Sequence, residues 1–431
     1  MWSQLPELIL TNIFHYLDCE DRCNVGKTCQ SWNHALASPI LWRCVTILID
    51  RDLRSGFPLA TEIAIKYGQH MRSLEMAWSR PYINPREFRL SSNIRAKEGL
   101  DFIEILKNKN IQIKEFILTN WFFSTNWNNR SKLLAAIAIF IRCQENLLTL
   151  SLLNAYLGVS DVLRLLRAVA NSSGYHLKTL DIRGAFRDWQ APHTNSRYLR
   201  YLGRMHALNT LHLDYPALSD QVLYALANGA SKTLKNFNIS IRDSDVRQHT
   251  VGDSAWSNLA IDCPDLKVSY TIVNISHYDD MSYLLLPSVP LSRFEMYGGH
   301  VWDQSRSRNF RSTVGLLITH YTNTLEEVIL QLRYNRELLD DLLVSMLQKC
   351  KQLTRLQYDG IIQNLGVLND IIKLQTLCKT KFSKIHVKPK NVNTRNRQIL
   401  TDITYQYNQK LYDQRVDFRI EDPTSSLLFY Y

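Results

Sequence analysis

The chain has 431 residues, of which 45% are hydrophobic and 21% charged, and its formal net charge is +11. This composition is typical of a folded soluble protein, and the length allows two or three domains or one extended array. No secretory signal pattern opens the chain, and the longest apolar run, residues 133–141, is far too short to span a bilayer. The eight cysteines are spread along the chain, which favours reduced thiols over a disulfide framework. We therefore expect a protein of the cytoplasm or nucleus that does not enter a membrane.

Three short helices are predicted at the N-terminus. The first covers residues 5–17, where Pro6 suits the first helical position because a missing amide donor costs nothing there. Asp18 ends it and can cap a second helix over residues 20–25, and a third covers residues 29–36. A helical block this small buries little surface by itself. We expect it to dock on the rest of the chain or on a partner.

The residue types and spacings of residues 1–44 resemble the F-box motif. The matched positions are Leu5-Pro6, Ile9-Leu10, Ile13-Phe14, Tyr16-Leu17, Asp21, Val25, Cys29, Trp32 and Leu41-Trp42-Arg43. In its family the F-box inserts into a groove of a Skp-family adaptor, which connects it to a cullin-RING ubiquitin ligase. The resemblance implies a set of adaptor-binding or motif-core residues: Leu5, Pro6, Ile9, Ile13, Phe14, Leu17, Val25, Cys29 and Trp32.

Three positions depart from the family pattern. Leu8 stands where the family usually carries Glu, Arg22 where it carries an apolar residue, and Gly26-Lys27 replaces a common Ser-Leu. The alternative is an unrelated helical cap at the start of a repeat domain.

A short repeat follows the helical block. Residues 45–49 alternate as a β-strand and follow without a Gly/Ser-rich linker, so we expect a stiff joint. The pattern of an apolar residue, two variable ones, an apolar one, a variable one and another apolar one then recurs, with middle anchors roughly 26 to 34 residues apart from Leu150 onward. Clear copies begin at Leu147, Leu177, Leu208, Leu234, Leu291, Leu325, Leu353 and Phe382, and weaker ones at Met71, Ile113 and Leu266.

Helical patterns lie between these strands. Ser160 and Ser219 are predicted N-caps of helices with one apolar face, and residues 339–347 have the same apolar helical spacing. A strand and a helix at a fixed period place parallel strands on one side and helices on the other, because each unit buries its apolar side against the next. We therefore predict an α/β leucine-rich-repeat horseshoe over residues 45–431, with concave strands and convex helices. The chain resembles F-box proteins with irregular leucine-rich repeats, particularly the F-box-only thirty-nine type.

Two segments exceed one repeat and are predicted insertions at a rim, residues 77–110 and residues 184–204. At the C-terminus, residues 418–420 are predicted as a last strand, and the apolar tail 427–431 as a cover for the open end of the array.

Side chains that alternate with the buried anchors should share the concave face. The substrate-binding candidates on this face are Asp181, Arg183, His212, Asp214, Glu295, Tyr297, Gln331, Gln357, Asp359, Lys384, His386 and Lys388. For each one the alternative is a solvated strand side chain without a partner.

Residues 371–401 contain eight basic residues and no acidic one. Such a segment attracts an acidic or phosphorylated protein, or nucleic acid. No aromatic ladder runs through it, which disfavours nucleic acid. The alternative is a solvated basic edge.

No catalytic, metal or cofactor site is predicted. Residues 26–28 imitate the end of a phosphate-binding loop, but Asp21 occupies the place of its upstream glycine. The cysteines near the N-terminus lack paired Cys-x-x-Cys knuckles, and no nucleophile elbow appears. The sequence therefore predicts a non-catalytic substrate receptor. The F-box resemblance implies binding to the Skp-family adaptor and, through it, to a cullin-RING scaffold, while the repeats are expected to hold an unidentified target protein, for which the basic segment suggests acidic or phosphorylated groups. The alternative is a repeat scaffold that acts without a ligase.

Overall fold

The computed structural model describes residues 4–53, 59–79, 85–121, 130–187, 190–245, 249–274, 278–298, 310–332, 337–377, 380–390 and 392–421. The chain forms two compact units. The first comprises Met1–Ala217 and Tyr224–Leu234, and the second Leu218–Leu223 and Lys235–Tyr431. Of the helices in these described ranges, none has the length and apolar character needed to cross a membrane.

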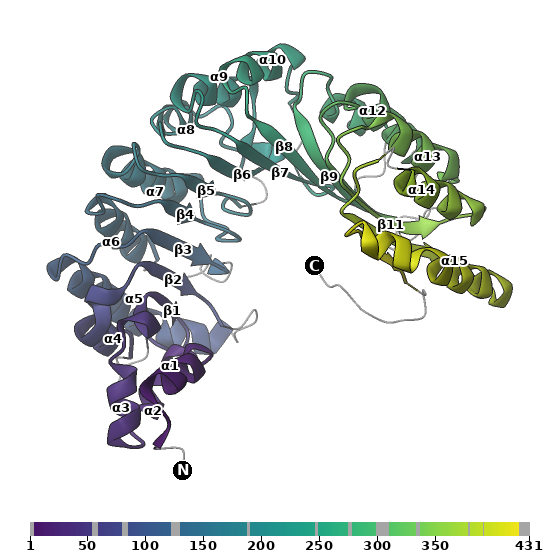
Figure 1. Cartoon of the computed structure of the whole chain (residues 1–431). Coiled ribbons are helices and arrows are strands. Elements are labelled where there is room, and N and C mark those ends of the chain that lie inside the picture. Colours follow the sequence, from purple (N-terminus) through teal and green to yellow (C-terminus); the bar gives the residue numbers. More distant parts are fainter. Residues whose placement is uncertain are drawn as a thin grey trace. The chain divides into compact units, whose positions relative to one another are not determined.

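Short helices open the first unit: α1 (Glu7–His15), α2 (Cys19–Val25), α3 (Gln30–Leu36) and the 3-10 turn η2 (Pro39–Trp42) (Figure 1). The predicted cap of α2 is confirmed, because the Asp18 carboxylate accepts the Asp21 amide at 2.8 Å. Helix α1 begins after the predicted position. Pro6 is its N-cap, and the Pro6 carbonyl accepts the amides of Ile9 and Leu10.

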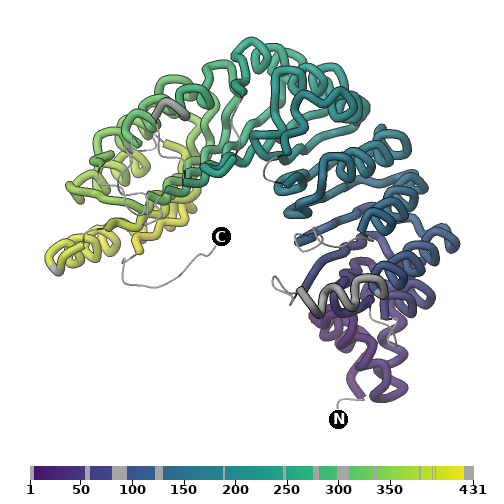
Figure 2. The backbone as a smooth tube through the Cα atoms, turned by 180° about the vertical axis from the view of Figure 1, so that it is seen from behind, coloured from purple at the N-terminus to yellow at the C-terminus, as the bar shows by residue number. Residues whose placement is uncertain are grey.

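The repeats of the first unit form a parallel sheet with one layer of helices. Its strands pair in chain order: β1 (Cys44–Leu48), β2 (Ser73–Ala77), β3 (Glu115–Thr119), β4 (Thr149–Ser151), β5 (Thr179–Asp181) and β6 (Thr210–Asp214). The tube view shows these strands stacked side by side with the helices along one side (Figure 2). The helical elements are α4 (Leu59–Tyr67), η3 (Gly68–His70), α5 (Pro85–Asn108), α6 (Arg130–Arg142), α7 (Val159–Ser172), α8 (Ser196–Leu202) and, after β6, η5 (Tyr215–Ala217) and α9 (Asp220–Gly229).

The second unit repeats this plan. Its parallel strands are β7 (Asn236–Arg242), β8 (Lys267–Val273), β9 (Leu291–Gly298), β10 (Glu327–Leu332), β11 (Arg355–Ile361), β12 (Lys384–Lys390) and β13 (Asp417–Ile420). The helices are α10 (Asp253–Asp262), α11 (Tyr278–Leu284), α12 (Phe310–His320), α13 (Asp340–Lys349), α14 (Gly366–Thr376) and α15 (Thr394–Asp413). The last strand predicted at residues 418–420 is therefore present as β13.

The predicted α/β repeat architecture is confirmed. Each copy of the apolar pattern, including the three weaker ones, supplies one strand. The middle anchors Leu150, Leu180 and Leu211 are fully buried, since each points from the sheet into the helix layer. Helix α9 begins directly after Ser219, whose hydroxyl accepts the Val222 amide at 3.3 Å, so this cap is also confirmed.

The predicted insertions are wrong. Most of residues 77–110 forms α5, which packs between α4 and α6 and buries Phe102, Ile103 and Leu106. Residues 184–204 contain α8, which contacts α7 and buries Tyr198 and Leu202. Each segment therefore contributes a helix to the repeat layer, the 24-residue α5 and the seven-residue α8. Their apolar residues stand at helical spacing and fill the core between neighbouring repeats.

Two further expectations have different outcomes. Helix α7 begins at Val159 with Gly158 as its N-cap, so Ser160 lies inside the first turn and is not the cap. The tail 427–431, expected to cover the end of the array, lies outside the described residues.

Candidate functional site

Helix α1 carries apolar side chains on two faces. On the inner face Leu10 and Phe14 are 1% and 2% exposed, and the Phe14 ring packs edge-on against Trp32 with centroids 5.6 Å apart. On the outer face four apolar side chains, the α1 strip, are 73%, 45%, 41% and 90% exposed, in the order Leu8, Ile9, Ile13 and Tyr16. Their spacing places them on neighbouring turns of one helix face. No described part of the chain covers this strip.

Most of the predicted adaptor-binding residues are accessible. Pro6, Ile9 and Ile13 are exposed, and the partly exposed ones are Leu5, Leu17, Val25, Cys29 and Trp32. Of the two roles allowed for these residues, Phe14 has the motif-core one and is not available for adaptor binding: one position beyond Ile13 on the helix, it faces α3 inside the block, where a partner cannot reach it. The sequence analysis omitted Leu8 and Tyr16 from the site. Their spacing to Ile9 and Ile13 was the signal that could have found them.

Arg22 explains one departure from the family pattern. Although charged, it is 7% exposed. Its guanidinium donates from Nε to the Phe14 carbonyl at 3.1 Å, from Nη2 to the His15 carbonyl at 3.0 Å, and from Nη1 to the Leu41 carbonyl. The last carbonyls of a helix have no partner within it. Arg22 therefore caps the C-terminus of α1 and ties it to η2, which fixes the direction of the α1 strip.

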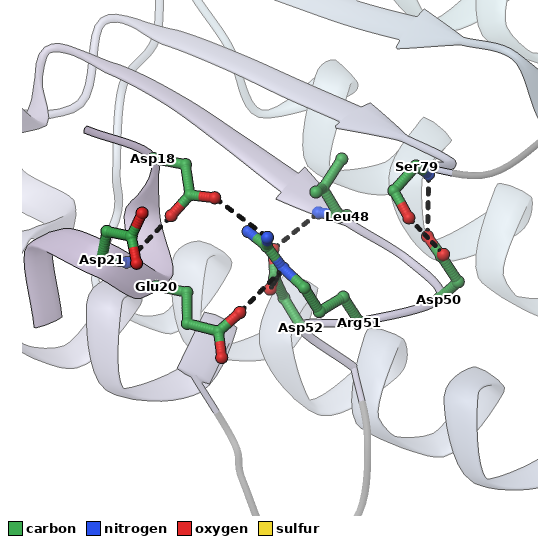
Figure 3. Close-up of polar contacts among 8 residues, drawn as sticks. All are labelled: Asp18, Glu20, Asp21, Leu48, Asp50, Arg51, Asp52 and Ser79. Atoms are coloured by element: carbon green, nitrogen blue, oxygen red, sulfur yellow. Dashed lines mark hydrogen bonds and ion pairs between the residues drawn. The ribbon is translucent and has the colours of Figure 1, made fainter. Parts of the chain in front are cut away.

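A second arginine joins the helical block to the sheet, and we call this group the Arg51 clamp (Figure 3). Nη1 of Arg51 lies 2.9 Å from Asp18 Oδ2, and its Nε lies 3.2 Å from Glu20 Oε2 and 3.0 Å from Asp52 Oδ1. Asp52 is 1% exposed and also accepts the Leu48 amide at 2.8 Å. Burial raises the pKa of Asp52, while the Leu48 amide and Arg51 lower it, so the carboxyl depends on these two partners to stay ionised.

Two more contacts stiffen the first repeats and their junction with the helical block. The Asp50 carboxylate accepts the Ser79 amide at 2.9 Å, which ties the residues after β1 to those after β2 (Figure 3). The Trp42 ring stacks on Tyr67 with centroids 4.0 Å apart. The missing linker noted in the sequence thus corresponds to a joint held by the Arg51 clamp and an aromatic stack.

The strand face of the second unit brings its predicted residues together in register. Tyr297, Gln331, Asp359 and Lys388 form one row across β9 to β12. In the adjacent row Gln357 pairs with His386. The predicted candidates therefore lie on neighbouring strands, as expected from their positions in the repeat.

Many charges on this face are already paired. Asp359 lies 3.4 Å from Lys390 Nζ and Lys388 lies 3.6 Å from Glu421, and the Asp417 carboxylate is hydrogen-bonded to the His386 imidazole at 3.0 Å. Glu327 is shared by Arg293 at 3.1 Å and Arg355 at 3.6 Å. The basic segment 371–401 is thus divided among α14, β12 and α15, and neighbouring strands neutralise part of it.

Two predicted candidates are corrections because they are buried. Glu295 is 8% exposed and ion-paired with Arg293, and Asp181 is 8% exposed and ion-paired with Arg183 at 2.6 Å. Each acid lies beside an arginine two residues away on the same strand face. These carboxylates hold their own strands and are closed to a target.

The remaining candidates of the first unit surround His212. His212 pairs in register with Asp181, and Asp214 accepts the Gly184 amide at 2.5 Å. Burial lowers the pKa of His212, the charge of Asp181 raises it, and the charge of Arg183 lowers it again. The net lowering favours the neutral imidazole. Within the described ranges, no three His, Cys, Asp or Glu side chains are arranged to hold a metal ion.

Comparison with known proteins gives independent information on this chain. Residues 2–48 match the F-box-like family model. F-box/LRR-repeat protein 21 of Bos taurus is 23% identical over 396 residues, 90% of this chain and 82% of that protein. The Mus musculus protein of the same name is 24% identical over 399 residues, with the same 90% and 82% coverage.

A chain from the crystal structure of a TLR13–ssRNA13 complex is 12% identical, with a TM-score of 0.31; the match covers 75% of this chain and 46% of that one. Our conclusion rests on the family model and the two relatives. Residues 2–48 are an F-box-like segment, and the chain is similar over 90% of its length to F-box proteins with leucine-rich repeats.

Proposed function

We propose that this protein is the substrate-recognition subunit of a Skp–cullin–F-box ubiquitin ligase. The α1 strip binds the Skp-family adaptor, the adaptor connects it to the cullin-RING scaffold, and the repeats hold a target protein. The observation that carries the proposal is the α1 strip itself, four exposed apolar side chains on a helix of the F-box-like segment. Exposed apolar side chains gathered on one helix face are characteristic of a protein interface.

The protein does no bond chemistry in this proposal. F-box/LRR proteins are generally substrate adaptors and not enzymes. The contribution of the chain is proximity, because a bound target reaches a high effective concentration at the ubiquitin-loaded enzyme. The Arg51 clamp supports this task, since a stiff joint between F-box and first repeat limits the positions that a bound target lysine can sample.

The strand faces are the proposed target-binding surfaces. Their partly exposed polar residues supply hydrogen bonds and charges that discriminate between targets: Arg183, His212, Asp214, Tyr297, Gln331, Gln357, Asp359, Lys384, His386 and Lys388. The proposal also places the protein in the cytoplasm or nucleus, which imaging of the tagged full-length chain would check.

The test is binding of the Skp-family adaptor by an Ile13→Asp variant. Ile13 is 41% exposed, so the substitution leaves folding largely intact while a carboxylate enters the apolar contact, and we expect affinity to fall at least about 100-fold. Ile261→Asp is the matched control, because Ile261 on α10 is 73% exposed and lies outside the F-box. Calorimetric titration of both purified variants gives the result.

Two outcomes contradict the proposal. One is undiminished adaptor binding by Ile13→Asp in a sample that melts at the wild-type temperature. The other is no adaptor binding by the wild-type chain. Target binding by the repeats without any adaptor-dependent ubiquitination would favour the alternative, a repeat scaffold that acts without a ligase.

A further inference from the structure

A pocket of about 550 Å³ lies in the first unit, away from the F-box and from the predicted target-binding residues. Arg130 at the start of α6, Ser160 and Asp161 in the first turn of α7, and Arg187 and Gln190 in the segment between β5 and α8 line it. These residues come from three consecutive repeats at the edge where strands end and helices begin.

The charges in the pocket do not balance. Asp161 is 6% exposed, and its carboxylate lies 3.0 Å from Arg130 Nη2 and 3.7 Å from Arg164 Nη1. Arg187 adds a third guanidinium, so these four side chains, counted among the described residues, carry a net charge of +2. Burial lowers the pKa of Arg130, the charge of Asp161 raises it, and the charge of Arg187 lowers it again. The two arginines on the pocket wall are therefore close enough to repel each other.

Arg187 has an unused donor inside the pocket wall. Its Nε is buried, and within the described part of the chain it has no hydrogen-bond partner. The backbone of Arg187 is fixed, since its amide donates to the Leu157 carbonyl at 3.1 Å and its carbonyl accepts the Gln190 amide at 2.8 Å. A buried donor on a cation is costly when it makes no hydrogen bond. The guanidinium also lines the pocket, so its charge acts on any anion bound there.

The start of α7 adds further donors. The Val159 amide donates to Gln190 Oε1 at 2.9 Å, and the amides of Asp161 and Val162 donate to the Gly158 carbonyl at 3.0 and 3.1 Å. Among the described residues, neither the amide nor the hydroxyl of Ser160 has a hydrogen-bond partner. Helix α7 spans 14 residues, so its N-terminus also contributes a favourable field for an anion.

We propose that this pocket binds a phosphate group, free or as a monoester on a protein side chain. Arg187 and Arg130 supply charge, and Ser160 supplies an amide and a hydroxyl donor. A phosphate monoester carries about −1.5 to −2 charges near pH 7 and offers three acceptor oxygens, which matches the excess charge and the unused donors. A carboxylate carries one charge and two oxygens, and would leave part of both unmatched.

The test titrates the full-length chain with inorganic phosphate, O-phospho-L-serine and acetate at constant ionic strength, followed by calorimetry. We expect saturable binding of at least one phosphate compound, tighter than that of acetate. Arg187→Gln should weaken binding about tenfold or more, because a hydrogen-bonded charge is lost. Ser160→Ala, at an exposed position, should weaken it several-fold without affecting folding.

Arg167→Gln is the matched control, since Arg167 is exposed on the same helix and does not line the pocket. It should bind phosphate as the wild type does. Binding of O-phospho-L-serine alone assigns the pocket to protein-borne esters, and binding of both compounds assigns it to the phosphate group as such. No saturable phosphate binding, acetate binding of equal strength, or unchanged binding by both Arg187→Gln and Ser160→Ala overturns the proposal.

Discussion

The α1 strip and the strand face of the second unit differ in how far their exposed side chains already have partners within the chain. The strip exposes four apolar side chains that no described residue covers. The strand face exposes polar groups, and many of its charges are paired with acids or bases on neighbouring strands. Burying the apolar side chains of the strip against a partner is favourable by itself, because it removes apolar surface from water. A ligand of the strand face must instead form charged contacts at least as good as the ion pairs that it breaks. The strip is therefore suited to one constant partner, and the strand face to selecting among targets.

Replacing Arg22 tests what holds the strip in place and should have the largest effect. Arg22→Met keeps the bulk of the side chain but removes the donors to the Phe14, His15 and Leu41 carbonyls. We expect the local opening free energy of α1 to fall by about 2–4 kcal/mol, because a charged hydrogen-bonding group is lost from a buried site. Amide hydrogen exchange of α1 measures it.

The control for this prediction is Arg22→Lys, which keeps the charge and one donor group but not the planar fork. The local opening free energy of α1 in Arg22→Lys should lie between the values for the wild type and for Arg22→Met. Unchanged α1 exchange in Arg22→Met would show that the strip is held by packing alone.

The Arg51 clamp gives the next effect in size. Arg51→Ala leaves the Asp52 carboxylate, 1% exposed, with the Leu48 amide as its remaining partner among the contacts described above. Because Arg51 is itself partly exposed, we expect a discounted loss of about 1–2 kcal/mol in the free energy of unfolding. Urea denaturation measures it, with exposed Arg43→Ala as a control expected to stay within about 0.5 kcal/mol of the wild type. Equal losses in both variants would mean that the joint does not depend on the clamp.

The sequence predicted the strip and the strand face unequally well. The repeat pattern identified the strands, because a buried anchor at every second position is a local signal. The direction in which each apolar residue of α1 points depends on where α3 packs, so the sequence could not separate Phe14 in the core from the exposed candidates, and Leu8 and Tyr16 were left out. The long helix α5 was taken for an insertion because the repeat that contains it is longer than the neighbouring repeats.

Ion pairs were the least predictable feature of the site. The partners of Glu327 are 34 residues before it (Arg293) and 28 after it (Arg355) in the chain, and meet it only through the register of β9, β10 and β11. Burial of Arg22 was equally hidden. The sequence around Arg22 indicates an amphipathic helix, but it does not show that three backbone carbonyls converge on the Arg22 guanidinium.

Glu327→Gln tests whether the pairs on the strand face contribute to folding. Both arginine partners are more than one third exposed, so solvent screens the interaction and we expect a loss of only about 0.5 kcal/mol. The difference should shrink at 1 M salt, where the screening length is about 3 Å. Urea denaturation at low and high salt measures it, with Glu326→Gln on the neighbouring exposed pair as the control. A loss that is large and independent of salt would indicate a packing role for Glu327.

The smallest effect concerns the pH dependence of the strand face at His212. Because burial lowers the pKa of His212 in the folded chain, the unfolded chain takes up the proton first as the pH falls. The stabilising contribution is therefore complete above the ordinary histidine pKa of about 6.5 and declines as the pH drops from there toward the lower folded value. His212→Gln removes this titration, so its stability should change less between about pH 7 and pH 5 than that of the wild type, while exposed His176→Gln keeps the wild-type slope. Thermal unfolding across this range measures the slopes, and a His212→Gln slope equal to the wild type would mean that the imidazole beside Asp181 is not held neutral by its surroundings.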